Sequence, residues 1–263
     1  MVLGLAALIV GCQKQDEHPP FLASCDNSNC PMLPGIVASV GGAGAPSTTS
    51  DAGAGTLTGQ VLLLADDSFV SASLFSQAAK VSADGANGTP VTDTWNGADP
   101  FSLAGVAQEA TNWVSVTPNL VGGDALVTYQ AVQTSAVQSV NLLLISGPVL
   151  DGIFDKVSAL RSSNFGQIVL SFRSAGTGLA LSGLHVTMAS AELAAYRSGT
   201  GWIRDDGTAT TDASGLVVFG NVQAANAAGT QTVVVTHGST PASQFAVRVV
   251  EGAATLSAVT VQL

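Results

Sequence analysis

The side chains best suited to catalysis are few and scattered in this sequence. The three histidines are His18, His185 and His237, and no two of them form a His-x-x-x-His pair. The chain also lacks the Gly-x-Ser-x-Gly turn of many hydrolases and the glycine-rich loop that cradles phosphates. His185 alternates with Leu184 and Val186, so we expect it to face solvent from a strand. His237 is placed at a hairpin end, and we predict no catalytic residue.

Acidic side chains occur as adjacent pairs at Asp66-Asp67 and Asp205-Asp206. Each pair lies in a polar segment typical of a turn, where we expect solvated carboxylates. Calcium needs six or more oxygen ligands from several loops, and a structural Ca²⁺ at one of these turns is the alternative hypothesis. We predict no bound metal and no cofactor.

Two further aspartates, Asp93 and Asp212, precede predicted turns that contain Gly97 and Gly215. A carboxylate in this place can accept backbone N–H groups and fix the hairpin. Glycine supplies the positive φ that such turns need. A role as calcium ligand or catalytic acid is the alternative, and we favour the structural interpretation.

The three tryptophans suggest another kind of site, because an exposed indole can stack on a sugar ring. Trp113 begins a predicted strand and is expected in the core. Trp95 and Trp202 lie near predicted hairpin turns, where exposure would let them contact a ligand. A carbohydrate-binding surface on Trp95 and Trp202 is therefore an alternative to packing at the edge of a core.

The amino terminus carries an apolar stretch over residues 2–11, and Cys12 follows it directly. The stretch is too short to span a bilayer, which takes about 20 residues. Ile9-Val10-Gly11-Cys12 resembles the lipobox of bacterial lipoproteins. This resemblance implies a signal peptide over 1–11 and lipid on the thiol and new amino group of Cys12. An apolar terminal segment with a buried free cysteine is the alternative, since no Lys or Arg precedes the stretch.

The residue after this cysteine is Gln13 rather than Asp. In Gram-negative lipoproteins such a residue suits sorting to the outer membrane. The resemblance therefore implies a cell-envelope protein held in the lipid bilayer through acylated Cys12. More than one acyl chain is needed, because a single chain binds a membrane only marginally.

The other cysteines, Cys25 and Cys30, are separated by four polar residues. In an oxidising envelope such a close pair indicates a small local disulfide. Free thiols are one alternative. A zinc site is another, although it would need two more ligands and His18 is the only imidazole nearby.

The composition excludes some classes of partner. Only 10% of the 263 residues are charged, and the formal net charge is -10. This balance argues against nucleic acid and against electrostatic binding to anionic lipid. Residues 31–55 are rich in Pro, Gly, Ala, Ser and Thr, so we predict a flexible tether over 12–56. A loop packed on the body is the alternative.

Beyond the tether the sequence repeats itself once, with few identities. The matching segments are 59–63 with 166–170, 71–75 with 183–187, 113–117 with 232–236, and 139–144 with 258–263. They are short, rich in Val, Leu and Thr, and separated by turn formers such as Asn87-Gly88. The pattern predicts an all-β fold of two tandem antiparallel β-sandwich modules, 57–146 and 166–263.

Two stretches look helical. Residues 150–160, within a connector over 147–165, place Ile153, Phe154, Val157 and Leu160 on one face. They would dock as a connector helix or lie as an amphipathic linker. Residues 190–196 are the second stretch.

The second repeat resembles the carboxypeptidase regulatory-like (transthyretin-like) modules of bacterial surface proteins, with bacterial Ig-like modules a close second. The resemblance rests on a Gly-x-Val-type first strand, a Thr-Asp…Gly…Phe…Val hairpin and a closing valine-rich strand: Gly166-Gln167-Ile168, Thr211-Asp212, Gly215, Phe219, Val222 and Val233-Val234-Val235. In the first repeat Leu103 and Val106 take the places of Phe219 and Val222, and all four are expected in the interior. The first repeat departs from the pattern at Thr94-Trp95-Asn96-Gly97.

These features together predict a non-catalytic, lipid-anchored envelope protein that presents two β-sandwich modules to an envelope protein or glycan that the sequence does not identify. The alternative is a carbohydrate-binding surface module. An enzyme is not expected, because few catalytic side chains are available.

Overall fold

The computed structural model describes the backbone of residues 35–37 and, in full, residues 53–108, 111–119, 124–134, 137–224 and 229–263. These residues form strands and a single helix, which confirms the predicted all-β class. Cys12, Cys25, Cys30 and His18 lie outside the described residues.

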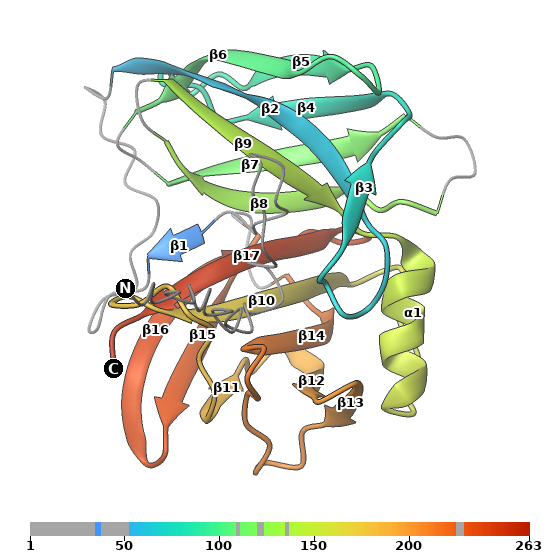
Figure 1. The fold of residues 1–263 in the computed structure, drawn as a ribbon, viewed down its shortest axis with the longest axis vertical. Helices are drawn as coiled ribbons and strands as arrows, with labels where there is room; N and C mark the ends of the chain where they lie inside the picture. Colours follow the sequence, from blue (N-terminus) through green and yellow to red (C-terminus); the bar gives the residue numbers. More distant parts are fainter. Residues whose placement is uncertain (1–34, 38–52, 109–110, 120–123, 135–136, 225–228) are drawn as a thin grey trace, which may run out of the picture.

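The first module is a sandwich of two sheets, drawn in the upper half of Figure 1. One layer contains β2 (Ala54–Leu64), β3 (Ala72–Leu74), β6 (Phe101–Ala107) and β9 (Val137–Leu144). The other contains β4 (Ala79–Ala83), β5 (Val91–Trp95), β7 (Thr111–Pro118) and β8 (Thr128–Gln133). Alternate residues of these strands point inward, so Leu103 is buried as predicted. A β-bulge at Gly105 shifts the register of β6 and turns Val106 inward as well, also as predicted.

The second module forms a similar sandwich in the lower half of the figure. One layer contains β10 (Gly166–Ser174), β12 (Ala191–Ser198), β13 (Gly201–Arg204), β14 (Leu216–Val222) and β17 (Ala254–Val261). The other contains β11 (Leu184–Thr187), β15 (Thr230–His237) and β16 (Thr240–Arg248). Every residue of β14 is buried, including Phe219 and Val222, because elements pack on both of its faces.

Most strand pairs are antiparallel, but the first and last strands of each module pair in parallel. β2 pairs with β9, and β10 pairs with β17 along eight registered residues from Gln167↔Ala254 to Ser174↔Val261. The predicted antiparallel sandwiches are therefore present, but each contains one parallel pair that the sequence did not indicate. Between its first and last strands, the chain of each module passes through the opposite layer. A parallel pair requires such a long crossover connection.

The two modules share one sheet. β8 of the first module pairs in parallel with β17 of the second, at Thr128↔Ala254, Tyr129↔Thr255 and Gln130↔Leu256. This pairing joins β5-β4-β7-β8 to β17-β10-β14-β12-β13 in a single ten-stranded sheet that also includes β1 (Gly35–Val37).

The two sandwiches cover opposite faces of the shared sheet. On one face lie Val81 and Val132, in the core of the first module, and Leu256. On the other lie Trp113 and Ala131, which pack into the core of the second module beneath β11, β15 and β16. Each half of the sheet is therefore covered by its own module from a different side.

The structure supports most of the sequence repeat and corrects one match. β2 and β10 are equivalent first strands, and β7 and β15 are equivalent central ones. The match of 71–75 with 183–187 is wrong, because β3 pairs with β2 whereas β11 pairs with β15. β4 is the true counterpart of β11, since Val81 faces Val116 as Val186 faces Val235.

The predicted connector helix is present as α1 (Gly147–Lys156) and docks on the body. Ser146 caps its first turn by accepting from the Val149 N–H at 3.4 Å, and a proline follows at the start. Ile153, Phe154 and Val157 are buried as expected, but Leu160 is 85% exposed because the helix ends before it. Figure 1 shows α1 beside the edge of the second module.

The second predicted helix, over 190–196, is wrong. These residues belong mainly to strand β12, which pairs with β14 on one side and β13 on the other. Leu193, Ala195 and Tyr196 are buried by this arrangement. Tertiary pairing with β14 overrides the helical propensity of the alanines and the leucine.

A third hydrophobic core joins the modules. It combines α1 with the ends of β2 and β9 and with the outer face of the second module's sheet. The turn between β2 and β3 inserts Phe69 into this core with a φ of 58°, and the Phe69 ring meets Trp202 edge-on at 6.1 Å. Beside it, the Asp67 carboxylate pairs with Lys156, and the Asp67 carbonyl accepts from Trp202 Nε1 at 3.3 Å.

The contact between α1 and β14 can be tested with a matched pair of variants. A Cβ at Gly220 on β14 would overlap the ring of Phe154 from α1, whereas a Cβ at Gly152 in α1 would meet nothing within 4 Å. Gly220→Ala should therefore lower the free energy of unfolding by about 1–3 kcal/mol. Gly152→Ala should raise it by up to about 1 kcal/mol. Urea titration would measure both, and a neutral Gly220→Ala would contradict the docking of α1.

Candidate functional site

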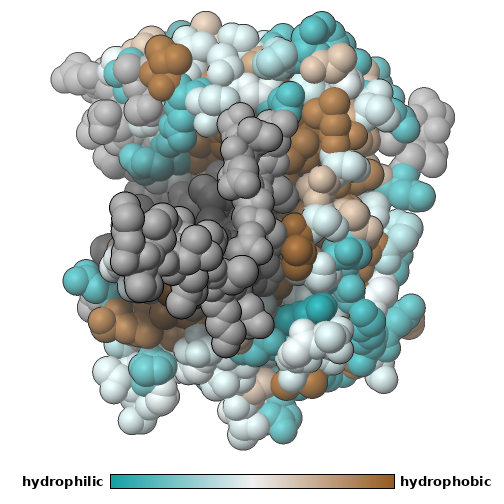
Figure 2. Space-filling model, in the orientation of Figure 1, coloured by the Kyte–Doolittle hydropathy of each residue, from teal (hydrophilic) through white to brown (hydrophobic). Residues whose placement is uncertain are grey.

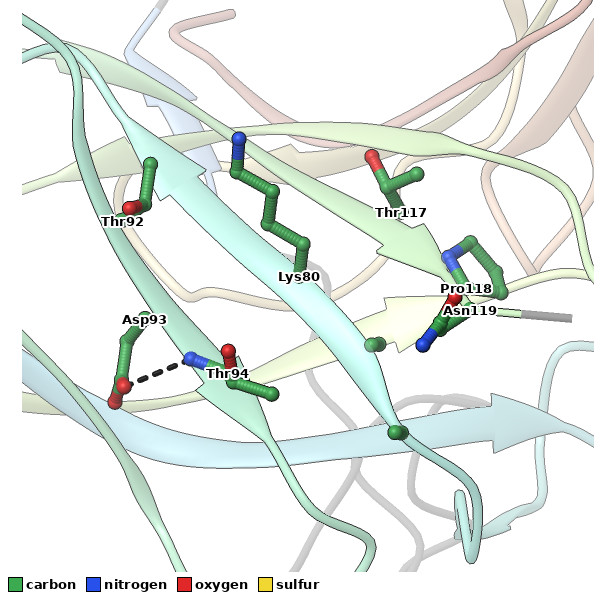
Figure 3. Close-up of a pocket in the computed structure, with 9 residues that line it drawn as sticks. Lys80, Thr92, Asp93, Thr94, Thr117, Pro118 and Asn119 are labelled. Atoms are coloured by element: carbon green, nitrogen blue, oxygen red, sulfur yellow. Dashed lines mark hydrogen bonds between the residues drawn. The ribbon is translucent and has the colours of Figure 1, made fainter.

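An open groove of about 530 Å³ lies on the exposed face of β5, β4 and β7 in the first module. Its walls are formed by residues of these three strands and of the segment after β7: Ala78, Ala79, Lys80, Thr92, Asp93, Thr94, Thr117, Pro118 and Asn119. In Figure 3 Lys80 rises from β4 between Thr92 on β5 and Thr117 on β7. The groove is therefore a polar patch on a sheet rather than an enclosed pocket.

The strand register explains why these side chains gather. Lys80 is directly opposite Thr94 on β5 and Thr117 on β7, so their side chains share one face of the sheet. Val81, the next residue, points to the buried face. Lys80 takes part in none of the ion pairs found in the described ranges. The groove thus offers an amine, hydroxyls and an amide for hydrogen bonding.

Sequence reasoning missed this groove, although the signal was present. Charged and polar residues alternate with small or apolar ones in Ala79-Lys80-Val81-Ser82-Ala83, and hydroxyls alternate in Thr92 and Thr94 and again in Ser115 and Thr117. What could not be foreseen was that three such strands lie side by side, because the pairing of β4 with both β5 and β7 is long-range.

Asp93 and Asp212 hold turns, as predicted. The Asp93 carboxylate accepts from the N–H of Thr94 at 2.7 Å and from that of Ser102, across the hairpin, at 2.6 Å. Asp212 accepts from the N–H of Ser214 at 2.8 Å and of Gly199 at 2.9 Å. Gly97 and Gly215 have the expected positive φ, 95° and 68°.

Each acidic pair contains one exposed aspartate and one that is largely covered. Asp66 and Asp206 are exposed turn carboxylates that accept from Ser68 and Thr208, as expected. Their partners Asp67 and Asp205 are largely covered, and the expectation that they are solvated is wrong for them. Both contact distant segments of the chain, which no local pattern could indicate. In the described ranges no group of three His, Cys, Asp or Glu side chains could hold a metal ion.

The prediction that His185 faces solvent is wrong, because its side chain contacts two other residues. Its Nε2 lies 3.4 Å from the Asp205 carboxylate, and its ring stacks on Tyr196 at 6.5 Å. The Tyr196 hydroxyl donates to the carbonyl of Val186 and accepts from its N–H, both at 2.7 Å, and burial strongly raises its pKa. His237 is exposed at the end of β15, as the sequence indicated. The His185 contacts fasten the loop after β13 to β11.

The alternative in which Trp95 and Trp202 are exposed is wrong, because both indoles are packed in the interior. Trp95 has no exposed surface and donates from Nε1 to the carbonyl of Phe75 at 2.7 Å. Trp202 is 5% exposed, packs on Phe69, and has the Arg197 guanidinium over its ring. Segments distant in the sequence cover both indoles, so neither ring is available to stack on a sugar. Trp113 is buried, as predicted.

The lipidation site Cys12 and the cysteine pair Cys25 and Cys30 lie outside the described residues, and the prediction for each remains untested. No helix in the described part of the chain has the length and apolar character needed to cross a bilayer.

Comparisons with known proteins gave only distant likenesses. No protein-family model matches the chain, and no curated protein matches it. Among solved structures, shaft pilin SpaA from Lactobacillus rhamnosus GG is 12% identical over 78% of this chain and 98% of its own, with a TM-score of 0.25. The group B streptococcus pilus 2b backbone protein is 13% identical over 70% and 78%, with a TM-score of 0.23.

The Bacillus anthracis TIE protein is 10% identical over 79% of this chain, with a TM-score of 0.24. The chain spans about a third of that protein, 34% of its length.

Burial of the indoles makes an optical prediction. Because Trp95, Trp113 and Trp202 are all at most 7% exposed, acrylamide should quench native emission several-fold less than that of the urea-unfolded chain. Soluble polysaccharides should leave the emission spectrum unchanged. A sugar-induced shift that disappears in Trp202→Phe or Trp95→Phe would contradict the burial of these rings.

The Asp66 turn makes a prediction about pH. Hydrogen bonds from Ser68, followed by one from Ser71, hold the Asp66 pKa below its usual value despite slight burial. A lowered pKa in the folded state adds stability above the unfolded pKa, near 4, and this is lost as the pH falls through the folded value. Asp66→Ala should therefore be less stable than wild type at pH 7, with a smaller difference at pH 2.

Ser68→Ala supplies the matched comparison, because it removes the main hydrogen-bond donor and keeps the carboxylate. Thermal melts should show that this variant, too, differs less in stability from wild type at pH 2 than at pH 7. A stability difference that is equal at pH 7 and pH 2 in both variants would refute the assignment.

Proposed function

We propose that this protein is a non-catalytic, lipid-anchored protein of the cell envelope that presents a rigid double sandwich for structural or protein-interaction roles. In this proposal residues 1–11 form the signal peptide, Cys12 carries the lipid, and much of 12–56 spaces the body from the bilayer. The Gln13 that follows Cys12 favours the outer membrane.

The observation that carries the proposal is the fusion of the two modules. A shared ten-stranded sheet and a third core containing α1 and Phe69 make one body from two sandwiches. Such a body holds its surface in a fixed geometry, which is what a structural or presenting protein requires. The acids Asp67, Asp93 and Asp212 contribute to this rigidity by holding turns and contacts between elements.

The surface supports recognition through weak, mostly uncharged contacts. On the face shown in Figure 2, hydrophobic side chains occur in several small groups separated by polar ones. The groove around Lys80 adds hydroxyls and a single amine. An envelope protein or a glycan could use this groove. The hypothesis of a tryptophan-based carbohydrate surface has lost its basis, since both indoles are buried.

The anchor is tested by labelling cells with a palmitate analogue. The full chain should incorporate label and sediment with the outer membrane, and Cys12→Ser should do neither, because only that thiol follows the apolar stretch. Cys25→Ser and Cys30→Ser are matched controls that should keep the label. Equal labelling of Cys12→Ser would overturn the anchored model.

A further inference from the structure

The last strand of the fold, β17, has two neighbours on one of its sides. On the other side β10 pairs with its full length. On this side β8 covers only Ala254 to Leu256, and β1 covers Ala258 to Thr260 in parallel. Figure 1 shows β1 lying beside β17, below β8. We call the stretch of β17 from Ala258 to Thr260, with the end of β8 beside it, the β17 notch.

The strand in this notch belongs to neither module. β1 is Gly35–Val37, inside the predicted tether 12–56, so for these three residues the predicted tether is a strand that pairs with β17. Sixteen residues separate it from Ala54, where β2 begins, and they include four glycines and one proline. Exchange of β1 would therefore break no strand of either sandwich.

The notch requires some strand to fill it. Val259 has no exposed surface and Ala258 has almost none, so β17 is an interior strand at this point. Without a neighbour, the outward backbone N–H and C=O groups of Ala258 to Thr260 would lack sheet partners, which is costly in a buried setting. β8 does not satisfy them, because its register with β17 ends at Gln130↔Leu256.

We propose that the β17 notch is a binding site for an extended peptide segment of an envelope protein, and that β1 is a resident placeholder which the partner displaces. The proposal rests on the proposed interaction role and names its surface and partner class. The partner enters parallel to β17 as an added strand and pairs through its backbone. It carries small or β-branched aliphatic residues, as Gly-Ile-Val does in β1, and no proline at the pairing positions.

The placeholder is suited to displacement because it is short. Three residue pairs provide few hydrogen bonds to hold β1 in place. A longer partner strand gains pairs that β1 does not make. The competition is intramolecular, however, so the tether acts at a high effective concentration and lowers the apparent affinity of any peptide.

The test uses the full chain and a fluorescent peptide with the sequence of residues 34–40, Pro-Gly-Ile-Val-Ala-Ser-Val. Ile36→Pro and Val37→Pro each remove one N–H group of β1, and because neighbouring N–H groups point to opposite sides of a strand, one of the two variants loses a hydrogen bond to β17. The peptide should bind that variant at least tenfold more tightly than wild type. Val40→Pro, which places a proline outside β1, is the matched control and should behave as wild type.

The site is confirmed by a photo-cross-linking residue at the peptide's isoleucine position, which should attach within β17 or β8. A peptide with proline at that position should not bind. Equal binding to wild type and both β1 variants, cross-linking elsewhere, or no binding to variants that melt like wild type would each overturn the proposal. These outcomes are independent of palmitate labelling, so a missing anchor and an absent notch site are distinguishable.

Discussion

The structure depends on the need to cover both faces of one long apolar sheet. A β-sheet with hydrophobic residues on both faces must pack against another layer on each. Here the first module covers one half from one side, and β11, β15 and β16 cover the other half from the opposite side. That leaves the outer face of the second half, where Val169, Val218 and Leu256 would meet water. α1 and the turn carrying Phe69 close this gap, and the modules become one body.

The relative size of the contacts in this joint indicates what holds it. Full burial of a side chain such as Phe69 is worth about 1.5–3 kcal/mol, and the edge-on contact with Trp202 adds to it. The partly exposed pair of Asp67 with Lys156 contributes little by comparison, about 0–1 kcal/mol. The positive φ of Phe69 costs some of this gain, because such backbone is strained for a bulky residue. Apolar burial therefore dominates the stability of this joint. The charges around Asp67 orient the side chains more than they add stability.

Local chemistry was predictable from the sequence and long-range contacts were not. Asp93, Asp212, Gly97 and Gly215 were correctly interpreted because their partners are nearby in sequence or set by the hairpin itself. The 190–196 segment was misjudged, and the alternatives for Trp95 stayed open, because β14 and Phe75 decide their environment from a distance. The fusion of modules depends on three residue pairs between β8 and β17, which are separated by more than a hundred residues and carry no distinguishing pattern. The docking of α1 lay between these cases: its apolar face was visible, but its seat at Gly220 was not.

The same constraint accounts for the kind of recognition that remains available at the surface. Covering both faces of the sheet uses the large aromatic side chains, and holding its turns uses several of the acids. Two kinds of group are left for a partner: hydroxyls and the amine on the exposed face of β5, β4 and β7, and backbone groups of β17 beyond its pairing with β8. In a chain with so little charge, a row of backbone groups is the more directional of the two. The half of β17 that β8 leaves open is therefore the place where the architecture most readily admits another chain.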